Sequence, residues 1–184
     1  AVKAYRYQTD IQRESLDNEI GIIQLFSDDP NIISYDSYFD LLFNNVKHRF
    51  IVMKYYDNLD LFDLCCSGNN FNNLPEVKCC YIAYQALKVL KLLKERNVVH
   101  HDIKLDNFLV LSKSPIKLLL TDFEYAEVLT YDASTRFCGT PYIRAPEILK
   151  QKPHNYAADM WSFGIVLYQI LYGYTPFDLD SRSE

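Results

Sequence analysis

The feature that most constrains the fold of this chain is an eleven-residue stretch in which a polar segment runs directly into an apolar one. Residues 100–110 read HHDIKLDNFLV. Asp102, Lys104 and Asn107 lie within six residues, a spacing too close and too irregular for one face of a helix. A loop can turn all three side chains toward one point, and the apolar residues 108–110 then predict a short buried strand at its exit.

These three side chains suit phosphoryl transfer. A carboxylate such as Asp102 can accept a hydroxyl proton, an ammonium such as Lys104 can neutralise a moving phosphate, and the amide oxygen of Asn107 can hold magnesium. The alternative is a polar surface loop in which the acid and the amide stand together by chance. The loop resembles the His-Arg-Asp catalytic loop of protein kinases, with His101 in the position of the arginine.

Composition indicates an ordinary folded domain. With 184 residues, 49% of them hydrophobic, the chain can bury a sizeable core without a disulfide or metal. A net charge of -5 and the lack of a basic stripe argue against nucleic-acid binding. The apolar run within 160–177 is too short and too interrupted to cross a membrane, so we interpret it as a buried core helix.

Cysteine usage and the first residues bear on location. The five cysteines, two adjacent pairs and Cys138, have no C-x-x-C spacing, which favours reduced, mostly buried thiols over a zinc site or a disulfide framework. The chain opens on Ala1 and shows no signal-peptide pattern. We therefore expect an intracellular protein, cytoplasmic or nuclear.

The resemblance extends to the start of the chain. Residues 1–3 match the Ala-x-Lys of the family's third strand, whose lysine holds the α- and β-phosphates of ATP, although Lys3 alone would be interpreted as a solvated lysine. Glu19 lies in the apolar face of an expected helix, where an unpaired carboxylate is costly. The family pairs that glutamate with the lysine; the alternative is a glutamate at the edge of the face that reaches water. The face comprises Ile11, Ser15, Leu16, Glu19, Ile20, Ile23 and Phe26.

Other segments have the pattern of regular structure. The β-branched and aromatic residues of 32–39 and 49–55 predict two strands. Residues 74–96 have the clearest helical spacing, with Asn73 as a plausible cap. We interpret this helix as a support for the loop that follows it.

The resemblance also implies a nucleotide site. The second expected strand ends at the gatekeeper Met53, and the backbones of Lys54 and Tyr55 would hydrogen-bond adenine. Asp60 falls where an acid often meets the ribose; as a helix-start residue it would have no such role. Leu109 completes the implied nucleotide-binding set.

Beyond the loop, residues 116–121, with the continuous apolar run 118–120, predict a strand that delivers Asp122-Phe123-Glu124. A carboxylate in that place, facing Asn107, is a reasonable magnesium ligand. The tripeptide matches the family's Asp-Phe-Gly in two positions of three. Glu124 brings a Cβ and a charge where glycine adopts positive φ easily, which predicts that Phe123 switches position less easily.

The segment 126–147 is irregular and closes on Ala-Pro-Glu, as the family's activation segment does. Thr130, Ser134 and Thr135 are candidate phosphorylation sites. In the family, the arginine beside the catalytic aspartate pairs with such a phosphate, whereas His101 would do so weakly and only when protonated. We therefore expect activation to depend less on phosphorylation of this segment.

These matches imply an α+β, bilobal protein-kinase-like fold. Residues 1–56 would form an incomplete, small, β-rich N-terminal lobe with the hinge, and 57–184 an incomplete, larger, mostly helical C-terminal lobe. Asp159 opens the expected core helix, and in the family this aspartate holds the backbone of the catalytic loop. The glycine-rich loop is expected before Ala1 and the last helices after Glu184.

The implied function is Mg-ATP-dependent phosphorylation of serine or threonine on proteins. Lys104 and Thr140 favour the serine/threonine class. The roles implied are catalytic for Asp102 and Lys104, magnesium binding for Asn107 and Asp122, and ATP positioning for Lys3 with Glu19. Expected partners are ATP, a protein substrate and a possible regulatory protein, without nucleic acid or membrane.

Two alternatives stand beside this reading. A pseudokinase scaffold is supported by His101 and Glu124, since a fold alone does not determine function. A small-molecule phosphotransferase with the same catalytic loop is disfavoured, because the Ala-Pro-Glu segment serves a peptide platform that a small substrate does not need.

Overall fold

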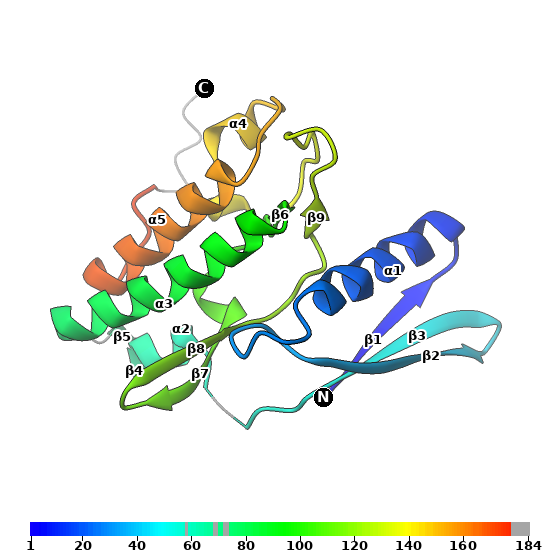
Figure 1. Ribbon diagram of the computed structural model, residues 1–184, viewed down its shortest axis with the longest axis horizontal. Helices are drawn as coiled ribbons and strands as arrows, with labels where there is room; N and C mark the ends of the chain where they lie inside the picture. The colour runs from blue at the N-terminus through cyan, green and yellow to red at the C-terminus, as the bar shows by residue number, and fades with distance from the viewer. Residues whose placement is uncertain (58, 68–69, 72–73, 178–184) are drawn as a thin grey trace.

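The computed structural model describes residues 1–57, 59–67, 70–71 and 74–177. It has a strand-rich N-terminal part and a mainly helical C-terminal part, which confirms the expected α+β class (Figure 1). The helices longer than one turn are α1 (Asp10–Leu25), α2 (Leu61–Cys65), α3 (Glu76–Glu95), α4 (Pro146–Leu149) and α5 (Ala157–Tyr172). The longer strands are β1 (Val2–Tyr7), β2 (Tyr35–Phe43), β3 (Val46–Met53), β7 (Phe108–Lys113) and β8 (Ile116–Leu120).

The N-terminal sheet has the strand order β1-β3-β2, with both pairs antiparallel. Strands β2 and β3 form a hairpin whose turn residues, Asn44 and Asn45, have positive φ, a conformation that asparagine tolerates. The prediction of a strand over 32–39 was wrong at its start. Ile33 donates its N–H to the Leu120 carbonyl at 2.9 Å, so this segment joins the two parts of the molecule before β2 begins.

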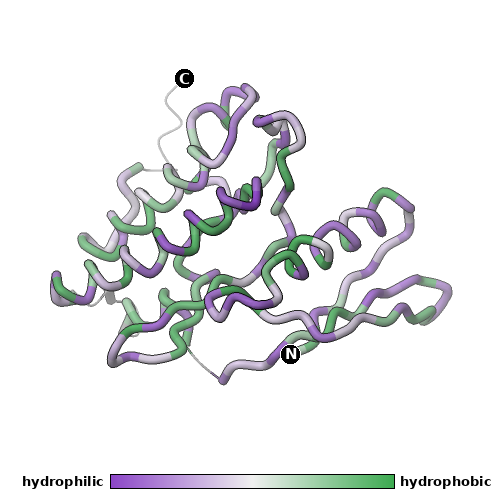
Figure 2. Tube along the Cα trace, in the orientation of Figure 1, coloured by the Kyte–Doolittle hydropathy of each residue, from purple (hydrophilic) through white to green (hydrophobic). Residues whose placement is uncertain are grey.

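Helix α1 starts at a capping box in which Thr9 and Gln12 exchange side-chain and backbone hydrogen bonds. The expected apolar face is confirmed from Leu16 onward, where Glu19, Ile20 and Ile23 are buried. Ile11 was placed wrongly: it is 79% exposed, because residues 10–15 are all exposed and no packed surface lies over the start of α1. Hydrophobic and hydrophilic residues alternate along α1 and α3 (Figure 2).

The C-terminal part is organised around α3, which lies beside α5 (Figure 1). The expected helix over 74–96 is confirmed with slightly shorter bounds, and the cap proposed at Asn73 lies outside the described residues. The expected helix is present as α5, which ends at Gly173 in a left-handed cap. The prediction that it is buried on nearly all sides was wrong: Phe163 and Val166 are buried, but Met160, Leu171 and Tyr172 are exposed, because the described part of the chain packs against only one side of the helix. No helix in the described ranges has the length and apolarity needed to cross a bilayer.

The main core joins both parts. Buried side chains from α1, α3, α5 and the β7–β8 hairpin form one cluster that includes Phe26, Leu93, Phe108, Phe123 and Val166. All five cysteines are free, with Cys65 and Cys79 buried and Cys80 exposed. Because β7 and β8 pack in this core, the polar loops at their ends are held in fixed positions.

Candidate active site

The polar loop of residues 100–107 is anchored by Asp159, which lies near the start of α5. The Asp159 carboxylate accepts the backbone N–H groups of His100 at 2.7 Å and His101 at 2.8 Å. His101 has a φ of 65°, so this support holds the chain in a conformation that it would rarely adopt alone. The role implied for Asp159 in the sequence analysis is seen in this geometry.

Asp159 also makes stability depend on pH. Burial raises its pKa from 3.8 to about 7, against the two backbone hydrogen bonds that lower it. The pKa of Asp159 is higher in the folded protein than in the unfolded chain, so its protonated form favours folding. This contribution to the unfolding free energy is complete below about pH 4 and is lost as the pH rises through 7. The quantity to measure is the difference in unfolding free energy between the unmodified protein and Asp159→Asn. We expect this difference to fall by a few kcal/mol from pH 4 to 7.

Urea denaturation at several pH values measures this difference. The exposed Asp28, replaced by asparagine, is the matched control for removing a surface carboxylate. A difference for Asp159→Asn that does not change with pH would contradict the prediction.

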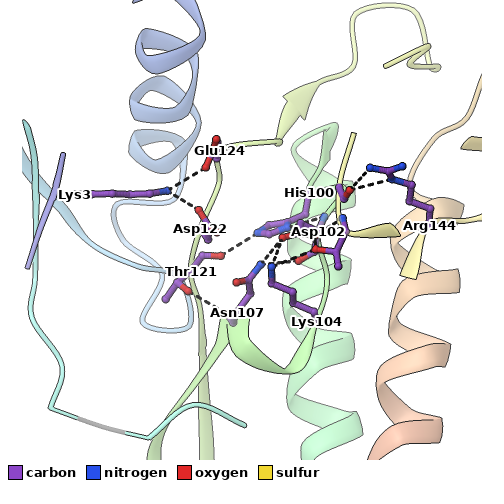
Figure 3. Close-up of polar contacts among 11 residues, drawn as sticks. Lys3, His100, Asp102, Lys104, Asn107, Thr121, Asp122, Glu124 and Arg144 are labelled. Carbon is purple, nitrogen blue, oxygen red and sulfur yellow. Dashed lines mark hydrogen bonds and ion pairs between the residues drawn. The ribbon is translucent and has the colours of Figure 1, made fainter. Parts of the chain in front are cut away.

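Asp102 lies at the centre of the polar contacts, with 1% of its surface exposed. Its Oδ1 accepts the Thr140 hydroxyl at 2.6 Å and the Thr140 N–H at 2.9 Å. Lys104 Nζ lies 2.9 Å from its Oδ2 (Figure 3). Burial alone would raise the pKa of Asp102, but the hydrogen bonds from Thr140 and Lys104 outweigh burial and lower it. The carboxylate is therefore ionised at neutral pH and can receive a proton.

Thr140 reaches Asp102 because the residue before it is a glycine. Gly139 has a φ of 83°, and a Cβ there would lie 2.1 Å from the His101 carbonyl oxygen. Any other residue would push the segment off the loop. Arg144 holds the same segment through hydrogen bonds from its guanidinium to the Gly139 carbonyl at 2.6 and 3.0 Å.

Asn107 is turned toward Asp102 by its amide nitrogen. The nitrogen donates to the Asp102 carbonyl oxygen at 2.8 Å and to Oδ2 at 3.2 Å. Since a carboxamide has its donors and acceptor at opposite ends, this leaves the oxygen of Asn107 as the end that can face a cation.

Lys3, on β1, meets carboxylates from α1 and from the segment after β8. Its Nζ lies 3.1 Å from Glu19 and 2.5 Å from Asp122. Burial favours the neutral amine, but the charges of Glu19 and Asp122 outweigh it and raise the pKa of Lys3. The expected Lys3–Glu19 pair is confirmed. The alternative, Glu19 reaching water, is wrong because Glu19 is 1% exposed.

Tyr5 completes the environment of Glu19 and was missed in the sequence. Its hydroxyl donates to Glu19 Oε2 at 2.8 Å. A signal was available, because Lys3 and Tyr5 are two residues apart on one strand and so point to the same face.

Glu124 and Phe123 clarify the departure from Asp-Phe-Gly. The residue with positive φ in this tripeptide is Asp122, at 62°, and the φ of Glu124 is negative, as side-chain-bearing residues prefer. The Glu124 carboxylate is 3.9 Å from Lys3 Nζ. Phe123 is fully buried, with its ring 4.9 Å from that of His100 and 6.2 Å from that of Phe26. The backbone thus accommodates Glu124 with Phe123 packed inward.

A pocket of ≈ 270 Å³ lies between the two parts of the molecule and gathers seven predicted residues. These are Lys3, Glu19, Met53, Lys54, Tyr55, Leu109 and Asp122. Ala1, Ile23, Ile33, Tyr56 and Thr121 also line it. The N–H of Lys54 donates to the Ser34 carbonyl at 3.0 Å, so a base bound here would meet the carbonyl of Lys54 and not its N–H.

Asp60 is not among the residues that line the pocket. Its side chain accepts the Asp63 N–H at 2.7 Å and caps α2, with backbone angles of the extended region. The structure therefore shows the helix-start role that the sequence left open, and contact with a ribose remains a prediction.

His101 and Ser134 bear on regulation. His101 is 2% exposed, and burial lowers its pKa to about 4, so the ring is neutral and enclosed. Ser134 was a wrong choice as a phosphorylation site in this conformation: it is 2% exposed, and its hydroxyl donates to Glu127 at 2.5 Å. Thr130 and Thr135 are exposed.

Comparisons with known proteins agree with this geometry. The family model described as protein kinase domain matches residues 1–184. The protein kinase C eye isozyme of Drosophila melanogaster is 33% identical over 100% of the chain and 26% of its own length. The cAMP-dependent protein kinase type 3 of Saccharomyces cerevisiae is 36% identical over 73% of the chain and 32% of its own length. The chain thus spans about a third or less of these two relatives.

Proposed function

The chain belongs to the protein kinase family, and we propose that it transfers the γ-phosphoryl group of Mg-ATP to serine or threonine hydroxyls of proteins. The observation that carries the proposal is the joint placement of two charge centres. The ionised Asp102 is held by Lys104 and Thr140, and Lys3 stands between Glu19 and Asp122 at the wall of the pocket. In this proposal the protein works where Mg-ATP is present, in the cytoplasm or the nucleus.

Magnesium suits the residues present. Asn107 and Asp122 offer amide and carboxylate oxygens, the hard ligands that magnesium prefers. Within the described ranges, no group of three or more His, Cys, Asp or Glu side chains could enclose a metal ion. Magnesium commonly takes one or two protein carboxylates and completes its shell with phosphates and water, so two ligands suffice. When bound with ATP, the ion would neutralise charge that develops on the phosphates.

The chain's own residues supply positioning and a proton acceptor. Asp102 orients the incoming hydroxyl and accepts its proton, since its lowered pKa keeps it ionised. Lys104, whose pKa the Asp102 carboxylate raises against burial, stays protonated and steadies the phosphate. Thr140 brings the activation segment against the same carboxylate, where a peptide hydroxyl would enter.

Lys3 positions the nucleotide. Its ammonium has three donors, and the contacts to Glu19 and Asp122 account for two of them. The third can reach a phosphate oxygen. Replacing Lys3 with methionine should therefore raise the KM for ATP and lower kcat/KM by roughly tenfold or more.

Transfer of labelled γ-phosphate from Mg-ATP to casein by the full-length protein tests the proposal. Lys88→Met, on the exposed face of α3, is the matched control and should match the unmodified protein. Lack of transfer by the unmodified protein under conditions where it binds ATP would overturn the proposal.

One observation supports a second candidate function, a nucleotide-binding scaffold without efficient phosphoryl transfer. Glu124 adds a third carboxylate within 3.9 Å of Lys3, beside Glu19 and Asp122, and so competes with phosphate for the ammonium. Reverting Glu124 to the glycine of the family separates the two candidates. A scaffold would gain transfer activity that it lacks with glutamate.

A further inference from the structure

Two buried histidines meet below the activation segment. The Nε2 atoms of His101 and His154 are 3.1 Å apart, and the rings are nearly perpendicular, at 73°. His154 is 5% exposed and lies just before α5. Its backbone forms two hydrogen bonds with Ser134 of the activation segment, at 2.7 and 2.9 Å. None of the roles assigned above uses this contact.

The contacts of the two Nδ1 atoms show how many N–H protons the pair of imidazole rings needs. His101 Nδ1 lies 3.0 Å from the Tyr125 carbonyl oxygen, and His154 Nδ1 lies 3.1 Å from the Lys152 carbonyl oxygen. A carbonyl oxygen only accepts, so each of these contacts needs an N–H, and the Nε2–Nε2 contact needs a third. Two neutral imidazoles carry two protons. One of the three contacts is therefore not a hydrogen bond when both rings are neutral.

The surroundings indicate which contact lacks the proton. Burial lowers the pKa of His101 against the contact with the Tyr125 carbonyl, which raises it. The nearby His154, Arg136 and His100 act in the same direction as burial, so the ring does not take up an extra proton at neutral pH. Glu127 accepts the Ser134 hydroxyl and Asp159 accepts the backbone N–H of His101. Among the described residues, the contacts of the four ring nitrogens include no carboxylate. The Tyr125 carbonyl also accepts from Arg136 Nη1 at 3.1 Å, so the choice depends on the ring nitrogens and not on the carbonyls. An unprotonated Nδ1 repels the carbonyl oxygen that it faces; beside the exposed Lys152 water can relieve that repulsion, whereas His101 is enclosed.

A metal ion between the two Nε2 atoms is the competing occupant, because ligating histidines also donate their second nitrogen to carbonyls. A site of this kind needs a third protein ligand or open access for water. Among the described residues no group of three or more His, Cys, Asp or Glu side chains could hold a metal, and both rings are buried. A proton is the occupant that fits.

We propose that His154 is a positioning residue that acts through a directed relay: His154 Nε2–H donates to His101 Nε2, and His101 Nδ1–H donates to the Tyr125 carbonyl. The relay connects three segments of the chain. His154 is bonded to Ser134 of the activation segment, His101 precedes Asp102 in the catalytic loop, and Tyr125 follows Glu124. It holds the activation segment against the catalytic loop without a phosphate. This inference rests on the proposed kinase function for its effect on activity.

Phosphoryl transfer by the full-length protein to casein gives the first test. His154→Leu removes the donor and should lower kcat by roughly tenfold or more with the KM for ATP within about twofold, because the loop shifts while the nucleotide pocket stays. His154→Gln restores an N–H donor and should recover activity to within about threefold. Thr135→Ala should also stay within about threefold. His48→Leu, on β3, is the matched histidine control.

Either of two results would overturn the relay: His154→Leu within about twofold of the unmodified protein, or His154→Gln as impaired as His154→Leu. Nitrogen-15 NMR of the unmodified protein gives a second test that needs neither a folded variant nor transfer activity. His101 should be the Nδ1–H tautomer at pH 7, and an Nε2–H tautomer or an imidazolium would contradict the relay. A protein without transfer activity that still shows this tautomer would fail the proposed function but keep the relay.

Discussion

Asp102→Asn should lower kcat for phosphoryl transfer by roughly 10²–10⁴-fold, the usual contribution of a general base. Asparagine has nearly the same shape, and its oxygen can still accept the Thr140 N–H and hydroxyl. It cannot take a hydroxyl proton, and it removes the charge that Lys104 Nζ faces at 2.9 Å. The loss should therefore appear in kcat with the KM for ATP nearly unchanged.

Steady-state kinetics with Mg-ATP and casein measure this effect, and thermal unfolding checks that the fold is retained. The matched control is Asp106→Asn, an exposed acid four residues further along the same loop. It should behave as the unmodified protein. A kcat of Asp102→Asn within about tenfold of the unmodified protein would show that another group accepts the proton.

Asp122→Asn should lower kcat/KM by roughly 10²–10³-fold at low magnesium concentration, because it removes the charged oxygen that we propose as a magnesium ligand. It also removes the carboxylate 2.5 Å from Lys3, although Glu19 still holds the lysine. Excess magnesium should recover part of the activity, since weaker binding is partly offset by mass action.

Activity titrated against magnesium concentration separates this role from a structural one. Asp132→Asn is the matched control, because Asp132 has a φ of 56° against 62° for Asp122, and asparagine tolerates both. An unchanged magnesium dependence in Asp122→Asn would contradict the assignment of Asp122 as a metal ligand, whatever its effect on stability.

The local pattern in the sequence was sufficient to predict the polar loop and the strand that follows it. Asp102, Lys104 and Asn107 are close in sequence and followed by a buried strand, so few backbone paths can separate them. The apolar face around Glu19 indicated that its carboxylate needs a partner, and the resemblance to the kinase family identified that partner as Lys3; the pair is present. The helical spacing of apolar residues placed both ends of α3 within two residues.

The errors came where a tertiary contact overrode the local pattern. Ile33 has strand propensity but bonds to Leu120 outside the sheet, and Ile11 fits the helical period but has no partner surface over it. Ser134 is a polar residue in an irregular segment, which predicts exposure. It is buried because His154, twenty residues later in the chain, pairs with its backbone.

By itself, the sequence was sufficient to predict the proposed class of chemistry and the residues of the loop, because these depend on side chains a few positions apart. Only the tertiary structure decided the ionisation of Asp102, the neutral state of His101 and the meeting of His101 with His154. These properties depend on burial and on partners 38 to 53 residues away, such as Thr140 and His154. Electrostatic energies depend on distance in space and on exclusion of water, and neither can be read from positions along a chain.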